Sequence, residues 1–292
     1  MDDHHSKREI DNLIYEILKS SKSLDVFPTP IDTIIEYCEL NLSNKSDFHR
    51  IPSNYVPKKI DSFTRMIRKI LGAFDRDEKE IYIDPSLPHV KQNFVKLHET
   101  AHGVIPWQKE IKYKDNEYTL SPDVKDAFEA EANYFASGGL FQLNRFEDEM
   151  NKLPLEIGSP MALAKKFGGS NHAAIRRYAE VSKKRCCLLV LQEKNGNSSS
   201  QTLDLKNSFQ SRSFTKEFGE LTWPKNFNMD FPFMIDYNQK RRFHTDGTIQ
   251  LLIHGEFIEF SYHYFNNHYN VFVLIIPVGE KNKSRTKIYL SP

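Results

Sequence analysis

KLHETAHGVIP, residues 96–106, is the stretch around which the rest of this sequence can be organised. It places His98 and His102 four residues apart, with Glu99 directly after the first histidine. Side chains four residues apart lie on the same face of an α-helix, so both imidazoles can reach a single metal ion. Glu99 would lie beside that face, where it can accept a proton from a water molecule on the metal. This spacing is typical of zinc hydrolases.

The residues around the motif predict the helix that this geometry requires. Pro88 precedes the segment that starts at His89, and Gly103 and Pro106 close it near Val104. Its apolar residues recur at helical spacing and predict a partly buried face. They are Phe94, Leu97, Ala101 and Val104.

A second helix is predicted to begin at Pro122 or Asp123 and to end at Gly138-Gly139, and it provides further candidate ligands. Glu129 and Asn133 share one face of it, so one can bind the ion while the other orients a ligating imidazole. We predict Glu129 as the third metal ligand and Asn133 as the orienting residue. Glu131 lies roughly opposite and is expected to be solvated. An apolar face of Phe128, Ala132, Phe135 and Ala136 is expected to press this helix onto the first.

The alternative to a metal site is a set of ordinary surface residues on two helices. With 11 histidines in the chain, an H-E-x-x-H match arises by chance roughly a few per cent of the time. The amphipathic helix around the motif and the matching Glu129 and Asn133 both favour the metal site.

Composition restricts the class of protein. The chain has 292 residues, 27% of them charged, and a net charge of +1, so it gives no electrostatic case for nucleic-acid binding as the main activity. Its three cysteines, two of them adjacent, do not form a disulfide framework. We find no signal peptide and no run of about 18 apolar residues, so we expect a cytoplasmic protein without membrane contact.

The order of elements predicts an α+β chain of two domains. Helices are expected over residues 8–20 and about 31–39, and a short strand over 80–86. A helical hairpin is expected at about 160–182, and strands dominate after about residue 185. We therefore predict a mostly helical domain with a small sheet over residues 1–190. A β-rich domain that senses a signal or docks a partner is predicted over residues 191–292.

These segments resemble the ImmA/IrrE-type metallopeptidases, gluzincins that act on transcriptional regulators. The resemblance covers roughly residues 8–190 and rests on IYIDPSLPHVKQNFVKLHETAH, residues 81–102, followed by an E-x-x-A-N-x-F-A pattern over 129–136. It implies a zincin-like fold in which zinc is held by His98, His102 and Glu129 and Glu99 is the general base. The chain departs from the family at GGLFQL, residues 138–143, where relatives often carry a Leu-Leu-Met-Pro-like run.

By this resemblance the chain is a zinc-dependent endopeptidase that cleaves a protein, such as a repressor or an antitoxin-like regulator. The residue that would stabilise the oxyanion stays open among Tyr118, Tyr134, His172 and Tyr178. Two alternatives are a zinc-containing adaptor that binds its partner without cleavage, and a DNA-binding regulator that uses residues 160–182. Near-zero net charge favours protein contact over DNA binding, despite Arg176 and Arg177.

Overall fold

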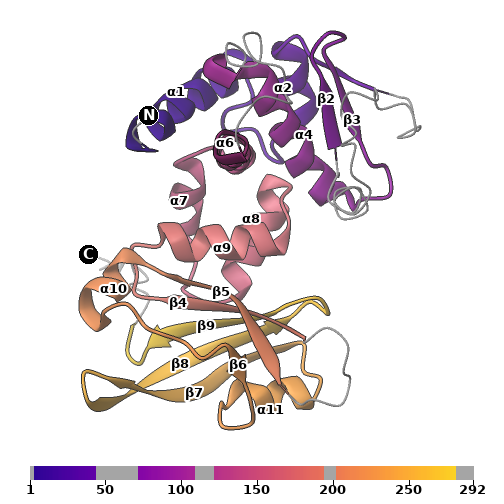
Figure 1. Cartoon of the computed structure of the whole chain (residues 1–292). Helices are drawn as coiled ribbons and strands as arrows, with labels where there is room; N and C mark the ends of the chain where they lie inside the picture. The colour runs from indigo at the N-terminus through magenta and orange to yellow at the C-terminus, as the bar shows by residue number, and fades with distance from the viewer. Residues whose placement is uncertain (1–2, 44–71, 109–121, 194–201, 281–292) are drawn as a thin grey trace, which may run out of the picture. The chain divides into compact units, whose positions relative to one another are not determined.

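The computed structural model describes residues 3–43, 72–108, 122–193 and 202–280, whose elements are drawn in Figure 1. The chain divides into two compact units. The first comprises Met1–Phe146 and Ala164–Ser170, and the second comprises Glu147–Leu163 and Asn171–Pro292. The fold is α+β, as predicted.

The first unit is built from helices and a small three-stranded sheet. Its helices are α1 (Asp3–Ser20), α2 (Ile31–Tyr37), α4 (His89–Val104) and α6 (Pro122–Leu140). The sheet has the order β1-β3-β2, with β1 (Asn41–Leu42) parallel and β2 (Gly72–Asp75) antiparallel to β3 (Glu80–Ile83). The helices predicted at 8–20 and 31–39 and the strand predicted at 80–86 all appear, within a few residues of the expected bounds.

Helices α4 and α6 form the part of the core that positions the candidate site. Leu97 and Ala101 of α4 are fully buried, as are Ala132 and Ala136 of α6. The short alanine side chains allow the two helix backbones to approach closely, while Phe135 fills the space beside them. The predicted apolar faces therefore meet, and they fix the polar faces of both helices relative to each other.

The helix predicted to end at Gly138-Gly139 continues through both glycines and ends one residue later, at Leu140. A Cβ at Gly138 would lie 2.6 Å from Cδ1 of Ile14, so this glycine permits close contact with α1. The helix ends instead where Gln142 and Leu143 adopt positive φ angles of 50° and 52°. Gln142 Nε2 donates to the Val26 carbonyl at 2.7 Å and thereby fixes the loop after α1.

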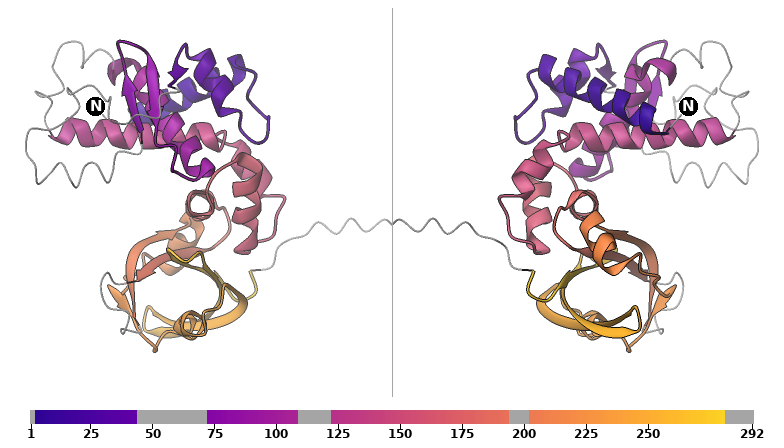
Figure 2. Two further views of the ribbon diagram at one scale, coloured as in Figure 1. Left: turned by 90° about the vertical axis from the view of Figure 1, so that its right-hand side faces the viewer. Right: turned by 90° about the vertical axis from the view of Figure 1, so that its left-hand side faces the viewer.

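The second unit contains a six-stranded antiparallel sheet with the order β6-β5-β4-β9-β8-β7. The strands are β4 (Cys187–Glu193), β5 (Leu203–Gln210), β6 (Asn226–Phe227), β7 (Phe243–Ile253), β8 (Glu256–Asn266) and β9 (Val271–Pro277). Figure 2 shows the sheet curving into an incomplete barrel. An aromatic-rich core includes Phe260 and Tyr264 of the sheet. It also includes Phe214 of α10 (Arg212–Phe218) and Phe233 of α11 (Phe233–Asn238).

The connection between the units includes α7 (Arg145–Met150), α8 (Gly158–Phe167) and α9 (Asn171–Val181). The predicted helical hairpin at 160–182 corresponds to α8 and α9, joined at Gly168-Gly169, where Gly168 has a φ of 78°. Helix α9 packs on β4 and β5, and β4 runs across residues 190 and 191. The compact units thus group α9 and the whole of β4 with the β-rich part of the chain. Among the described helices, none has the length and apolar character needed to cross a membrane.

Candidate metal centre

The structure brings the imidazoles of His98 and His102 on α4 next to the carboxylate of Glu129 on α6. The two Nε2 atoms lie 3.3 Å apart. Glu129 Oε2 lies 3.2 Å from His98 Nε2, and its Oε1 lies 3.5 Å from His102 Nε2. Among the described His, Cys, Asp and Glu residues, these three form the group whose donor atoms lie close enough together to hold one metal ion. Its members come from two helices and are spread over a segment of 32 residues, from His98 to Glu129.

These separations agree with the dimensions of a zinc site. Zinc binds imidazole nitrogen and carboxylate oxygen at about 2.0–2.2 Å, so neighbouring ligands in a tetrahedral site lie roughly 3.3–3.6 Å apart. The three measured separations, 3.2, 3.3 and 3.5 Å, lie within or close to that range. Two nitrogens and one oxygen are also the donors that a catalytic zinc site uses when it keeps its fourth position for water.

The outer nitrogen of each imidazole is held by the oxygen of a side-chain amide. His98 Nδ1 lies 3.2 Å from Asn133 Oδ1, and His102 Nδ1 lies 2.8 Å from Gln108 Oε1. An amide oxygen only accepts hydrogen bonds, so each neutral histidine carries its hydrogen on Nδ1 and directs the lone pair of Nε2 at the site. When neutral, both imidazoles are therefore in the tautomer that binds a metal through Nε2.

Gln108 is held in this orientation by a second layer of contacts that the sequence did not reveal. Its Nε2 donates to the Phe128 carbonyl at 3.3 Å and to Glu131 Oε2 at 2.8 Å. Glu131 Oε2 also accepts a hydrogen bond from Trp107 Nε1 at 2.8 Å. The expectation that Glu131 is merely solvated is wrong, because its carboxylate orients the amide that orients His102.

Electrostatics couple the three candidate ligands. Burial disfavours the charged form of His98, but the hydrogen bond to Glu129 and the nearby charges of Glu99 and Glu129 outweigh it and raise the pKa of His98. Hydrogen bonds from His102 and His98 lower the pKa of Glu129. Without metal, the carboxylate is therefore ionised and favours a proton on the neighbouring imidazole. A divalent cation would replace that proton.

Glu99 lies on α4 between the helix core and β2. Its side chain is buried, and its Cγ would lie 3.2 Å from a Cβ placed on Gly72. The same Cβ would lie 2.5 Å from Cγ1 of Val95, so Gly72 makes room beside the small sheet for Val95 as well as for Glu99. Arg76, just after β2, donates from Nη2 to the His102 carbonyl at 3.0 Å near the end of α4, which fixes β2 to the helix that carries the motif.

The predicted donors for an oxyanion are engaged away from the metal centre or lie outside the described residues. Tyr134 donates to both carboxylate oxygens of Asp11, at 3.0 and 3.1 Å. Tyr178 donates to the Pro154 carbonyl at 3.0 Å, and the His172 ring lies against Phe272. Tyr118 lies outside the described residues. Among those described, the structure thus assigns these candidates to structural contacts.

Comparison with known proteins agrees with the resemblance seen in the sequence. Residues 60–178 match the model of the IrrE N-terminal-like domain, a peptidase family. Among solved structures, a Mycobacterium tuberculosis transcriptional regulator has a TM-score of 0.54 and 12% sequence identity, with 94% of this chain and 77% of that chain covered. At this identity the likeness shows the fold alone. A comparison with curated proteins gave no match. The segment that carries the candidate metal centre, within residues 60–178, is therefore similar to the IrrE N-terminal-like domain family.

Proposed function

We propose that this protein is a zinc-dependent peptidase that cleaves a protein substrate. The observation that carries the proposal is the convergence of His98, His102 and Glu129, with both histidines in the tautomer that binds through Nε2. These three residues would hold the ion. Zinc, when bound, supplies a Lewis acid that acidifies a coordinated water and polarises a peptide carbonyl.

The chain's own residues account for the proton transfers in this reaction. Glu99 follows the first candidate ligand directly and its carboxylate is close enough to His98 to raise the pKa of that imidazole. We assign Glu99 as the general base, which takes a proton from the attacking water and passes it to the leaving amine. Asn133 and Gln108 act as positioning residues, since they touch the histidines rather than the reacting atoms.

The proposed substrate is a DNA-binding regulator. The similar fold of a protein described as a transcriptional regulator supports a role in gene regulation. Direct binding of DNA through α9 is disfavoured by the contacts of Arg176, which pairs with Glu180 at 2.8 Å and lies over the ring of Phe209. The net charge of +1 likewise gives no electrostatic case for DNA binding.

Co-expression with a candidate DNA-binding regulator tests the proposal. We expect wild type to cut that regulator and Glu99→Gln to leave it intact while retaining zinc, because glutamine keeps the shape but cannot accept the proton. His89→Ala removes an exposed histidine from the first turn of the same helix and should cut like wild type. An intact regulator with all three proteins would contradict cleavage of that partner.

The same experiment separates the peptidase from an adaptor that binds without cutting. Metal content alone cannot do so, since both would contain zinc. Equal regulation of the partner's target genes by wild type and Glu99→Gln, without any cleavage product, would favour the adaptor. Loss of regulation in Glu99→Gln, with zinc and partner binding retained, would favour the enzyme.

A further inference from the structure

Strand β7 is the long outer strand of the six-stranded sheet and has an unused edge. It stands at the end of the strand order and pairs with β8 alone over the part of the chain that the structure describes. It spans 11 residues, whereas β6 at the opposite end of the sheet spans two. An edge strand of this length presents a row of backbone donors and acceptors to any extended chain that lies alongside.

The register of the β7–β8 hairpin identifies the outward-facing groups. The hairpin closes through the two-residue turn His254-Gly255, with φ angles of 53° and 87°, as in a type I′ turn. Ile253 and Glu256 flank this turn, and backbone groups alternate in direction from that pair onward. The N–H and C=O groups of Leu252, Gln250 and Thr248 therefore point away from β8. The side chains of these three residues are also exposed.

This edge lacks the features that usually prevent strand pairing. Residues 247–253 read GTIQLLI and contain no charged residue and no proline. Charged side chains, proline and bulges are the common protection of exposed edges. The one irregularity of β7, between His244 and Gly247, lies before this segment and leaves it regular. Leu252 and its cross-strand partner Phe257 expose 63% and 73% of their surface at the hairpin tip. Apolar surface of this kind suits an incoming strand.

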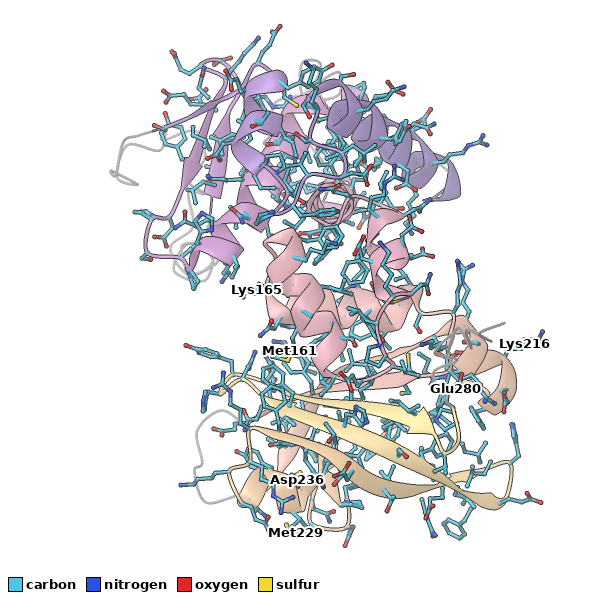
Figure 3. All side chains as sticks on the ribbon, turned by 180° about the vertical axis from the view of Figure 1, so that it is seen from behind. Met161, Lys165, Lys216, Met229, Asp236 and Glu280 are labelled. Carbon is cyan, nitrogen blue, oxygen red and sulfur yellow. The ribbon has the colours of Figure 1, made fainter. Side chains whose placement is uncertain are left out.

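A groove runs beside the same edge and is acidic. It has a volume of about 380 Å³ and is lined by Thr248, Ile249 and Gln250 of β7, Glu259 of β8, and the segment 230–232. Met229 and Asp236, which bracket that segment, are labelled near each other in Figure 3. The charged residues that line the groove are Asp230 and Glu259, and none of its described lining residues is basic. The groove therefore favours a cationic occupant.

We propose that β7 binds an extended, basic segment of a partner protein by strand addition. The backbone of the segment would pair with Thr248, Gln250 and Leu252, and its lysine or arginine side chains would lie near Asp230 and Glu259. An apolar residue of the segment would contact Leu252 and Phe257. A second copy of this chain is the less favourable occupant, because pairing β7 with itself would bring two acidic grooves to one interface.

The proposal is tested by the binding of a short peptide that is long enough to span residues 247–253. On one face of the extended peptide, two lysines would lie near Asp230 and Glu259 and a valine near Leu252. Fluorescence anisotropy would measure the peptide's affinity for the full chain carrying Glu99→Gln, which prevents any turnover of the probe. Hydrogen exchange would locate the contact. We expect binding, with new protection of the Thr248, Gln250 and Leu252 amides. Since binding is measured, the outcome does not depend on the peptidase proposal.

Matched variants and probes separate strand addition from simple charge attraction. Gln250→Pro removes an outward N–H without breaking the pairing to β8, so binding should weaken by at least about tenfold, whereas Gln250→Thr should bind like the parent. The double variant Asp230→Asn/Glu259→Gln should weaken peptide binding by roughly three- to tenfold. A peptide N-methylated on every amide, which has no N–H group to donate from either edge, should not bind.

Three results would overturn the proposal. One is equal binding of the methylated and unmethylated peptides, which would mean that charge attraction explains the binding without strand pairing. Another is protection that appears elsewhere than residues 247–253. The third is a concentration-dependent dimer, abolished by Gln250→Pro, together with no peptide binding, which would identify the occupant as a second copy.

Discussion

Two amide side chains, Asn133 and Gln108, determine which imidazole nitrogens face Glu129. Their oxygens accept hydrogen bonds from the Nδ1 atoms of His98 and His102, so that both Nε2 lone pairs converge. Gln108 is fully buried, and it is fixed by Glu131. Contacts of this kind raise the basicity of a ligand and limit its rotation, which strengthens metal binding without touching the metal.

Replacing Gln108 tests this role. We expect Gln108→Ala to weaken zinc binding by about 10- to 100-fold, because the His102 ring loses the partner that fixes its tautomer. Competition against a chromophoric chelator would measure the change. Gln92→Ala is the matched control, since Gln92 lies in the first turn of α4 and bonds only to the backbone before it, at Leu87 and Pro85. Equal zinc affinities for the two variants would contradict the role of Gln108.

The raised pKa of His98 predicts how zinc binding depends on pH. In the metal-free protein, Glu129 stabilises a proton on this imidazole above its ordinary pKa of 6.5. Zinc binding must displace that proton, so affinity falls as pH is lowered, and the fall begins above pH 6.5. Chelator competition across a pH series, corrected for titration of the chelator, would show it. An affinity that is constant from neutral pH to well below 6.5 would contradict the coupling.

The sequence predicted the site residues that lie on regular helices and missed the one that follows a helix. His98, Glu99, His102, Glu129 and Asn133 occupy positions whose faces follow from a 3.6-residue period. Gln108 lies in a short helical turn, residues 106–108, that follows α4 and is too short to show a period in the sequence. Its partner Glu131 lies on the regular helix α6, but its role depends on a contact with Gln108 outside that helix, which the helical period does not reveal.

At the scale of elements, the glycine pair in α6 shows how close approach overrides local propensity. Glycine is unfavourable inside a helix, and the sequence therefore suggested a helix end at Gly138-Gly139. The structure shows that Gly138 faces Ile14 of α1 at a distance that leaves no room for a Cβ, whereas a Cβ at Gly139 would make ordinary contacts with Leu97 at 3.5 Å. Only one of the two glycines is required by contact between helices.

This difference gives a matched pair of substitutions. Gly139→Ala should raise the free energy of unfolding by about 0.5–1 kcal/mol, because alanine is the better helix former and fits. Gly138→Ala should lower it by about 1 kcal/mol, because the new methyl group forces Ile14 to move within a buried contact. Chemical denaturation of both variants would measure the changes. The interpretation fails if both substitutions stabilise the protein equally.

Short elements of the β-rich unit were beyond prediction for a physical reason. Helix α11 has six residues, FMIDYN, too few to show a helical period. It is held by tertiary contacts of the buried Asp236, which accepts hydrogen bonds from Tyr262 at 2.7 Å and Arg241 at 3.0 Å. The strands β8 and β9 were predictable, because each shows alternating or continuous apolar residues along its length.

At the scale of the whole molecule, each compact unit has its own hydrophobic core. Leu97, Ala101 and Phe135 lie in the first, while Phe214, Phe260 and Tyr264 lie in the second. The candidate metal ligands all belong to the first unit. A ligand that binds one folded unit stabilises that unit by mass action and leaves an independent unit unchanged.

Calorimetry should therefore resolve two thermal transitions that respond differently to zinc. Saturating zinc, at about a thousand times its dissociation constant, should stabilise one unit by roughly 4 kcal/mol. The other transition should not move. Glu129→Gln should remove most of the zinc-dependent shift, while Glu280→Gln, in the second unit, should retain it. A single transition that moves as a whole with zinc would contradict the separate cores.

The division of the metal centre between α4 and α6 has a consequence for protein synthesis. A ribosome releases His98 and His102 before Glu129, Glu131 and Asn133, so the growing chain first exposes a pair of histidines without its carboxylate. The tautomer of His102 also depends on Glu131, because Glu131 fixes the Gln108 amide that contacts His102. A nascent chain thus cannot assemble the centre until the second helix has emerged and docked. The order of translation therefore delays the candidate site until α6 has been made and has packed on α4.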